Sequence, residues 1–357
     1  MKASKIILFI LSFTVLLSSS ACSSNNEKKK SSYNSTDIAA TIGDVKVPKY
    51  EFIFYLKNAK RDMEGESGVK ETNDINVLKK YWSDKVNNVV REDEAKKKSL
   101  QSIKELIILL TKAKSQNLQL DQKSKDTVKA HMDNLIKTKG NGDRKKAEQV
   151  IKETYGVNLF QYESIYNDYL LGYDIFVNKF KQDLNISDKD IRDYYNKNIK
   201  DYENKVIVKH ILISNNDEKT GEKLTGAKLE EKKKLAEDIL QKAKSGSDFE
   251  SLVLQYSQDP GVKENHGQIS FTKGQTMKEF DNWAFNAKDG DIGLVETQYG
   301  YHVIKFIKKS TYDDEKANIK ERLENDAYDK KFNEWVNAPE FTVKPNQSLI
   351  DSISILQ

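Results

Sequence analysis

Two strand-like segments, each carrying one histidine, restrict this chain to a fold that contains a β-sheet. Segment 206–213 is rich in β-branched residues and contains His210, and segment 300–306 contains His302. Runs of this composition, bounded by turn residues, are typical of β-strands. The turn sequence of residues 256–261 lies between them. The stretch therefore predicts a mixed α/β domain.

The chain on both sides of this stretch has the periodicity of α-helices. Apolar residues recur at helical spacing over residues 100–113, 159–169 and 313–337. Residues 39–47 alternate like a short hairpin and precede the first helical segment. A single helix cannot bury its apolar stripe alone, so we expect the C-terminal helix to pack against the N-terminal helices.

These patterns divide the chain into successive segments. In chain order, we expect a signal peptide (1–21), a flexible tether (22–36), the N-terminal part of a helical domain (37–203), a mixed α/β domain (204–309), a C-terminal helix that packs on the helical domain (310–340) and an irregular tail (341–357).

The N-terminus has the features of a targeting signal. Lys2 and Lys5 precede the apolar run of residues 6–17, which is shorter than the roughly 20 apolar residues of a spanning helix. A basic start, an apolar run and small residues are typical of a secretory signal peptide. Residues 23–36 have almost no apolar content and cannot bury a core, so we expect a flexible tether there.

Cys22 is the only cysteine, so the sequence excludes an intrachain disulfide and a zinc–thiolate site. A cysteine directly after such a signal is typical of bacterial lipoproteins, whose thiol takes a diacylglycerol. Ser19 stands where lipoproteins usually have a Leu-like residue, and residues 19–21 also fit an ordinary signal-peptidase site. Lipid attachment at Cys22 and plain secretion are therefore two interpretations of this segment.

The charge pattern argues against a nucleic-acid-binding protein. Lys and Arg number 59 against 55 Asp and Glu, whereas nucleic-acid binders gather basic residues on one face. Here the lysines alternate with acids along helical segments, as on a solvated helix surface. The sequence contains no P-loop, no dinucleotide fingerprint and no His-Glu-x-x-His motif. We therefore expect no cofactor and no metal.

The order of motifs between the two strands resembles the parvulin family of peptidyl-prolyl isomerases. The matching parts are the His210 strand, the turn with Asp259, the segment before Phe280 and the His302 strand. The helical flanks and the lipoprotein-like start resemble PrsA-type extracytoplasmic foldases, and SurA chaperones are more distant relatives in type. The resemblance implies an α+β chain in which a parvulin domain, an antiparallel sheet flanked by helices over residues 204–309, is inserted into a helical chaperone domain.

The resemblance implies a set of polar site residues. His210 and His302 match the family's paired core histidines, which would be neutral because burial disfavours the charged ring; a purely structural pair is the alternative. Asp259 matches a position held by Cys or Asp and thought to act on the electrostatics of the substrate carbonyl, although Asp-Pro-Gly also predicts a turn. Thr297 matches a threonine that hydrogen-bonds the histidines; an ordinary strand threonine is the alternative.

The resemblance also implies an apolar pocket for the proline ring. Phe280 and Ile269 match walls of this pocket. Met277 lies three residues before Phe280, whereas the methionine of the family motif lies four before it. The preceding loop is shorter than the family pattern, and His266 stands in place of the first glycine of the usual pair. These changes alter the lining of the pocket and leave the polar residues in place.

Rotation about an X–Pro bond breaks no covalent bond, so the reaction needs no nucleophile, metal or cofactor. The first functional hypothesis is an isomerase that assists the folding of newly secreted polypeptides at the outer face of a Gram-positive-type cell membrane. The second is a holdase chaperone whose parvulin domain is inactive and structural. A solute-binding lipoprotein would need repeated βα units, which the helical N-terminal half lacks. The resemblance also implies a homodimer.

We expect the helical domain to carry most of the chaperone activity. Its apolar stripes and Tyr162, Tyr166, Tyr169 and Tyr173 offer amphipathic contact surface for varied partners. The competing interpretation is that these tyrosines belong to the core.

Overall fold

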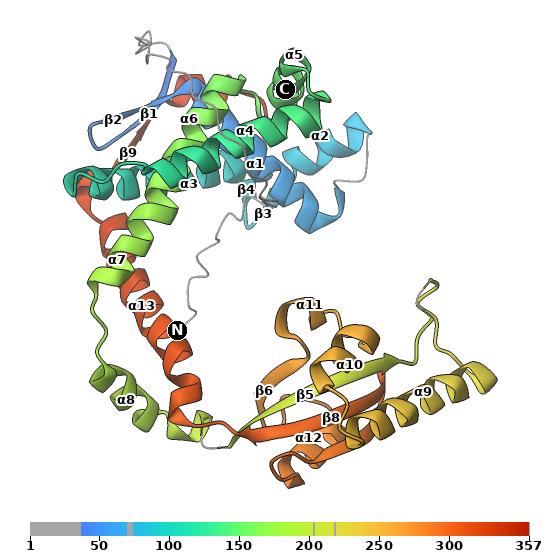
Figure 1. Ribbon diagram of the computed structural model, residues 1–357. Helices are drawn as coiled ribbons and strands as arrows, with labels where there is room; N and C mark the ends of the chain where they lie inside the picture. The colour runs from blue at the N-terminus through green and yellow to red at the C-terminus, as the bar shows by residue number, and fades with distance from the viewer. Residues whose placement is uncertain (1–36, 70–73, 203, 218, 357) are drawn as a thin grey trace. The chain divides into compact units, whose positions relative to one another are not determined.

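The chain forms two compact units. The computed structural model describes residues 37–69, 74–202, 204–217 and 219–356 (Figure 1). The first unit, here called the helical unit, comprises the described residues of Met1–Leu184 together with Ala327–Gln357; the second, the sheet unit, is Asn185–Asp326. The expected signal peptide, tether and lipid site at Cys22 lie outside the described residues. Within the part that is described, no helix is both long and apolar enough to cross a membrane.

Consecutive helices make up most of the helical unit (Figure 1). Its elements are β1 (Ile38–Ile42), β2 (Val45–Pro48), α1 (Lys49–Ser67), α2 (Ile75–Ser83), β3 (Lys85–Val86), β4 (Val89–Val90), α3 (Arg91–Ser115), α4 (Gln122–Gly140), α5 (Arg144–Tyr155), α6 (Leu159–Tyr169), the π-helix η3 (Leu170–Phe176), α7 (Val177–Asp183), η5 (Pro339–Phe341), β9 (Val343–Pro345) and α14 (Gln347–Asp351). Local signals set the helix ends: Asn158 and Gln161 form a capping box at the start of α6, and Asn141 ends α4 in the left-handed conformation.

A three-stranded antiparallel sheet, in the order β2-β1-β9, joins the beginning and the end of the helical unit. The predicted hairpin is present, with β1 and β2 on either side of a turn at Gly43. The prediction of an irregular tail over residues 341–357 is wrong, because β9 pairs with β1 and α14 follows it. Without β9, β1 would present an unpaired edge. Pro345 is tolerated because it lies at the end of an edge strand.

Two apolar cores hold the helical unit together. In the first, Ile42 of β1 and Ile108 of α3 lie with Phe332 and Phe341, so late residues of the chain complete a core that early residues begin. The second core is formed by α4, α5 and α6 with Phe54 of α1.

Two of the four tyrosines expected at a contact surface are core residues. Tyr162 and Tyr166 are buried within the second core. Tyr169 and Tyr173 are only partly buried, and their ring centroids lie 5.1 Å apart. Helical periodicity shows that these residues share a face, but it does not distinguish a face that packs inside the unit from one that meets a partner.

The sheet unit contains a four-stranded antiparallel sheet in the order β6-β5-β8-β7 (Figure 1). Its elements are α8 (Asp188–Lys197), the 3-10 helix η4 (Ile199–Asp201), β5 (Lys205–Ser214), α9 (Gly226–Lys244), α10 (Phe249–Tyr256), α11 (Val262–Asn265), β6 (Gln268–Thr272), α12 (Lys278–Asn286), β7 (Ile292–Thr297), β8 (Gly300–Lys309) and α13 (Tyr312–Val336), whose last part belongs to the helical unit. An antiparallel sheet flanked by helices confirms the predicted fold class.

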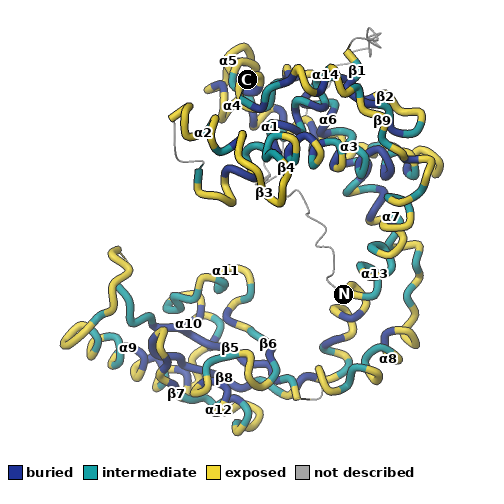
Figure 2. The backbone as a smooth tube through the Cα atoms, turned by 180° about the vertical axis from the view of Figure 1, so that it is seen from behind, coloured by how far each residue is buried: buried dark blue, intermediate teal, exposed yellow. Residues whose placement is uncertain are grey.

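Side chains alternate between the two faces of this sheet, as the pleat requires. Ile211 and Val303 pack against α9 and α10 on one face. Val208 and Phe306 pack with α12 on the other. Figure 2 shows β5 and β8 as largely buried strands. His210 follows Val208 by two residues, so its side chain lies on the face covered by α12.

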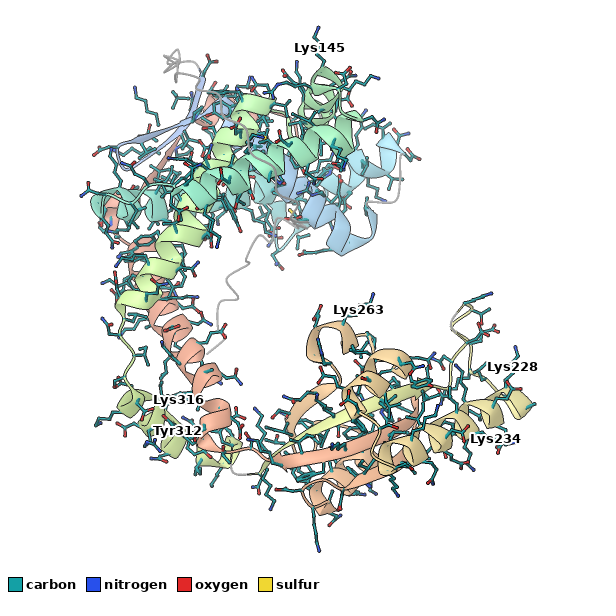
Figure 3. The ribbon with its side chains drawn as sticks, viewed as in Figure 1. Lys145, Lys228, Lys234, Lys263, Tyr312 and Lys316 are labelled. Atoms are coloured by element: carbon teal, nitrogen blue, oxygen red, sulfur yellow. The ribbon has the colours of Figure 1, made fainter. Side chains whose placement is uncertain are left out.

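Buried contacts tie the sheet to the start of α13. Lys205 Nζ lies 2.8 Å from Glu315 Oε2, and the Ser310 hydroxyl donates a hydrogen bond of 2.7 Å to Glu315 Oε1. Glu315 is buried. Further out, Asp188 of α8 forms an ion pair with Lys316 of α13, and Figure 3 marks the position of Lys316. The start of α13 is therefore bonded to the first residue of β5 and to the residue after β8, which lie side by side at one end of the sheet.

We predict that residues 204–309 fold alone and that Asn185–Asp326 is more stable than this fragment by about 1–3 kcal/mol, because the shorter fragment lacks the hydrogen bonds to the charged Glu315. Urea unfolding of both fragments, followed by circular dichroism, measures the difference. In the longer fragment, Glu315→Gln should remove most of the gain. A shorter fragment without a cooperative transition would show that the domain boundary lies elsewhere.

Candidate active site

The histidines of the two central strands face each other. His210 lies on β5 and His302 on β8, where Leu212 is the register partner of His302. The two Nδ1 atoms are 3.4 Å apart, and the ring centroids are 5.6 Å apart with an angle of 25° between the planes. The residues are 4% and 3% exposed. A hydrogen bond between the two Nδ1 atoms requires that one ring carries a proton there and the other does not.

Burial keeps both rings neutral. Loss of hydration lowers the pKa of His210, and the negative charge of Asp259 opposes this shift. For His302, loss of hydration lowers the pKa to about 4, with a further contribution from His210 and an opposing one from Asp259. Both rings are therefore uncharged at pH 7, as expected for imidazoles removed from water.

Thr297 and Asp259 lie at opposite ends of the histidine pair. Thr297 Oγ1 is buried and lies 2.9 Å from His302 Nε2. Asp259 Oδ2 lies 3.7 Å from His210 Nε2, which is beyond a direct hydrogen bond but within reach of a Coulombic interaction. The structure therefore brings the four polar residues together in one row, Thr297–His302–His210–Asp259, here called the polar row.

Asp259 takes part in a turn and also lies beside His210. Its Oδ1 accepts a hydrogen bond of 2.8 Å from the backbone N–H of Gly261, which forms the turn. Its Oδ2 faces His210. The side chain is 26% exposed, so Asp259 lies between the buried histidines and solvent.

Two polar residues that sequence reasoning missed hold Asp259 in place. β6 pairs with β5 only as far as Lys209, which leaves the following part of β5 open on that side. There the Gln258 side-chain oxygen accepts a hydrogen bond of 2.7 Å from Ser214 N–H, and Ser257 Oγ accepts one of 3.2 Å from the backbone of β5. The available signal was a polar pair directly before Asp-Pro-Gly.

Phe280 places an aromatic wall against the polar row. Its ring is fully buried and meets His210 edge-on at 5.6 Å and His302 edge-on at 5.3 Å between centroids. Ile269 and Met277 are partly buried and pack against the same core. The three predicted apolar residues therefore lie in one cluster, on the face of the sheet that carries the histidines.

His266, which stands where the parvulin pattern has a glycine, adopts a left-handed backbone conformation. His266 and Gly267 have φ values of +51° and +72°. A Cβ on Gly267 would lie 2.6 Å from the backbone oxygen of His210, so only glycine fits there. Histidine is among the residues that enter the left-handed region most readily. His266 therefore fits the left-handed conformation of the turn that leads into β6.

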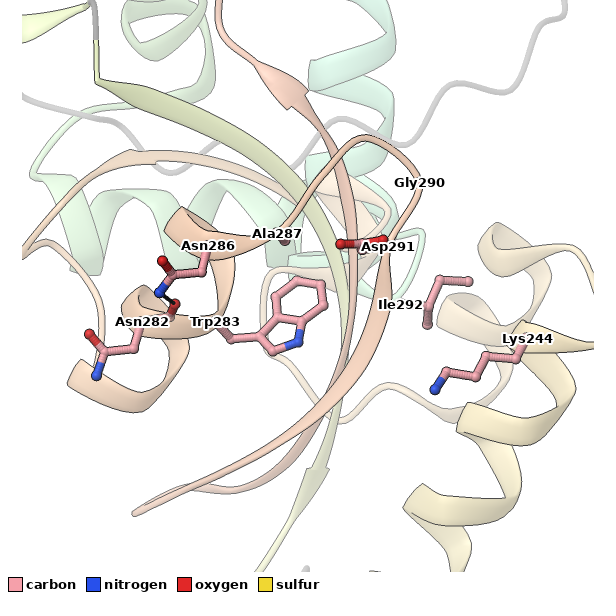
Figure 4. Close-up of a pocket in the computed structure, with 8 residues that line it drawn as sticks. All are labelled: Lys244, Asn282, Trp283, Asn286, Ala287, Gly290, Asp291 and Ile292. Atoms are coloured by element: carbon pink, nitrogen blue, oxygen red, sulfur yellow. Dashed lines mark hydrogen bonds between the residues drawn. The ribbon is translucent and has the colours of Figure 1, made fainter.

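A separate open pocket of about 770 Å³ lies elsewhere on the sheet unit. Trp283 and Asn286 of α12, Lys244 of α9 and Ile292 of β7 are among its lining residues (Figure 4). It contains none of the predicted site residues. Across the described part of the chain, no group of His, Cys, Asp and Glu side chains is arranged to hold a metal ion.

Comparisons with known proteins point to one family. Residues 194–310 match the family model for the PPIC-type PPIase domain. Foldase protein PrsA 4 of Bacillus cereus is 37% identical over 144 residues, which cover 39% of this chain and 43% of that protein. Foldase protein PrsA of Caldanaerobacter subterraneus is 28% identical over 312 residues, which cover 85% of this chain and 86% of that protein. The first alignment thus spans less than half of its relative.

One solved structure is similar to this chain over most of its length. The crystal structure of PrsA from Bacillus subtilis is 23% identical, with 73% of this chain and 86% of that chain covered and a TM-score of 0.38. The family match makes residues 194–310 a PPIase domain of the parvulin class. Over most of its length the chain is similar to PrsA foldases.

We predict that the sheet unit loses stability as the pH falls from about 6.5, where histidine titrates in an unfolded chain. Below that pH the unfolded state binds a proton that folded His302 binds only near a pKa of about 4. The resulting loss in the free energy of unfolding amounts to about 3 kcal/mol by pH 4. Thermal unfolding between pH 7 and 4, followed at the indole signal of Trp283, measures it.

An NMR titration of the His302 ring provides the direct check. The expected midpoint lies near pH 4. A midpoint at the ordinary histidine value would contradict the burial on which this prediction rests.

Proposed function

We propose that this chain is an extracytoplasmic foldase that catalyses cis–trans isomerisation of X–Pro bonds in newly secreted polypeptides. The observation that carries the proposal is the polar row, which is buried against Phe280 and open to solvent only at Asp259. Such a site offers a neutral, shaped surface for the proline ring and one charge for the peptide bond.

Isomerisation is limited by the partial double bond between carbonyl carbon and proline nitrogen, whose rotational barrier is about 18–20 kcal/mol. The resonance form that creates this double bond also places negative charge on the carbonyl oxygen. The Asp259 carboxylate, if it lies beside that oxygen, disfavours this form and therefore favours the twisted state with a single C–N bond. The apolar wall at Phe280, Ile269 and Met277 holds the proline ring while the bond turns.

The histidines act by position in this proposal. Because both rings are neutral at pH 7, they leave Asp259 as the charge nearest to the substrate. The contact of Thr297 with His302 fixes that ring, and the contact between the rings fixes His210. The polar row therefore holds Asp259 in position beside the pocket, and it transfers no proton to the substrate.

The alternative is a holdase with an inactive parvulin domain. One observation favours it: Ile75, Val77, Val86 and Val89 of the helical unit are large apolar side chains that remain exposed. They lie close together along the chain, on α2, β3 and β4, and would suit contact with unfolded polypeptides. Loss of isomerisation without loss of aggregation suppression, in the variants below, would assign the two activities to different units.

We predict that Asp259→Asn lowers kcat/KM for a proline-containing peptide about tenfold, equivalent to ~1.4 kcal/mol of transition-state stabilisation. Asparagine still accepts the hydrogen bond from Gly261 N–H, so the turn survives while the charge is lost. Asp259→Ala removes both and should be at least as damaging. A protease-coupled isomerisation assay measures the rates.

Asp217→Asn is the matched control, because Asp217 also accepts backbone hydrogen bonds in a turn of the same unit. It should leave kcat/KM unchanged. Wild-type activity in Asp259→Asn, together with a loss in Asp259→Ala, would show that Asp259 only forms the turn.

We further propose that the chain is anchored by a lipid on Cys22 to the outer face of the cell membrane, and that it can pair with a second copy of itself. The support for the anchor is the signal-like N-terminus and the position of the only cysteine. Two or more acyl chains at one N-terminus hold a protein firmly, whereas a single chain binds only weakly.

Cys22→Ala should release the protein into the medium or block its processing. Metabolic labelling with a radioactive fatty acid measures the attachment, and Cys22→Ala provides the unlabelled control. A wild-type chain that takes up no fatty acid would leave plain cleavage within residues 19–21 as the correct interpretation.

A further inference from the structure

Asp281 is a buried carboxylate that the polar row does not use. It lies in the first turn of α12, directly after Phe280, and is 4% exposed. Its two oxygens accept hydrogen bonds from the backbone N–H of Gly274 and from the hydroxyl of Thr276. A buried polar group of this kind needs partners for its hydrogen bonds. Both of these donors come from one loop.

The loop between β6 and α12 has few other restraints. Within it, Gln275 N–H donates to Thr272 O at 3.2 Å, and Thr272 N–H donates to the Gln275 side chain at 3.0 Å. Gly274 has a φ of +91°, a conformation that glycine adopts without strain. Met277 is the N-cap of α12 and makes no side-chain capping bond. The hydrogen bonds to Asp281 therefore connect the middle of this loop to α12.

Both ends of the loop pack into the apolar cluster that contains Phe280. Phe271 precedes the loop, and its ring centroid lies 5.7 Å from that of Phe280. Met277 follows the loop and packs against the same core. Phe280 in turn meets both histidines edge-on. A shift of the loop would therefore move Met277 relative to Phe280 without touching the polar row.

We propose that Asp281 is a positioning residue for isomerisation: by binding Gly274 and Thr276 it fixes Met277 against Phe280 and sets the width of the proline pocket. The inference rests on the proposed isomerase function. It also explains how a loop that is shorter than the parvulin pattern, with Met277 one position nearer to Phe280, still closes the pocket: the carboxylate draws the loop onto α12.

The test compares Asp281→Asn with Asp289→Asn in the full chain. An amide can accept from only one of the two donors and turns an NH₂ group toward the other, so the loop should loosen. Asp289 is an exposed aspartate shortly after α12 and serves as the matched control. For Asp281→Asn we expect KM for a proline-containing peptide to rise about tenfold while kcat stays within about twofold, because ground-state and transition-state binding weaken together. Asp289→Asn should change neither.

A second pair of variants covers the case in which Asp281→Asn does not fold. Thr276→Val removes one donor at a partly buried side chain, and Thr276→Ser restores it. We expect Thr276→Val to raise KM several-fold and Thr276→Ser to return it toward the wild-type value. A general loss of stability would not produce this order of KM values among the variants.

An NMR contact separates failure of this inference from failure of the proposed function. The nuclear Overhauser effect between the Met277 methyl group and the Phe280 ring should be present in the wild type and weakened in Asp281→Asn and Thr276→Val. An inactive wild type that shows these changes would refute the isomerase and leave the positioning role intact. Unchanged KM and an unchanged Met277–Phe280 contact in the variants would overturn the inference.

Discussion

The buried contact between His210 and His302 is the constraint on which the rest of the sheet unit depends. The Nδ1 atoms of the two rings are 3.4 Å apart and closed to water, which favours neutral rings because a charged ring would be a buried cation without solvation. The contact also requires the observed register of β5 against β8, in which Leu212 lies opposite His302. A slip by one residue would turn the side chains of a strand to the opposite face of the sheet. The site and the fold are therefore set by the same pairing.

The two faces of the sheet differ in their role: one carries an apolar core and the other carries the proposed site. One face is covered by α9 and α10 and contains an apolar core without a polar site residue. The other face carries the histidines and meets α12, which supplies Phe280 to the pocket and Asp281 to the loop. A single short helix thus holds both the aromatic wall and the group that orders the adjoining loop. This arrangement suits a reaction that breaks no bond and depends on the shape and local charge of the site.

Much of this arrangement follows from the sequence, because it depends on local patterns. The two histidine strands, the Asp-Pro-Gly turn and the early hairpin are each encoded by neighbouring residues, and all three are present. Contacts between distant segments are different. Two examples are the pairing of β9 with β1 and the hydrogen bonds of Ser257 and Gln258 to β5. Both depend on which strand edges the rest of the fold leaves unpaired, and a local sequence pattern does not indicate this. In the sequence, Asp281 is indistinguishable from the other acidic residues of an amphipathic helix.

Equilibrium exchange spectroscopy tests the central claim most directly, because it observes the bond rotation without a coupling protease. The full chain in EDTA at pH 7 would be added to a proline-containing peptide, and exchange between its cis and trans signals recorded by NMR. The account predicts exchange cross-peaks that are absent without protein, unchanged cis and trans populations, and weaker cross-peaks for Asp259→Asn. Peptide binding that shifts resonances of the sheet unit but produces no exchange would contradict it and leave a binding module in place of an isomerase.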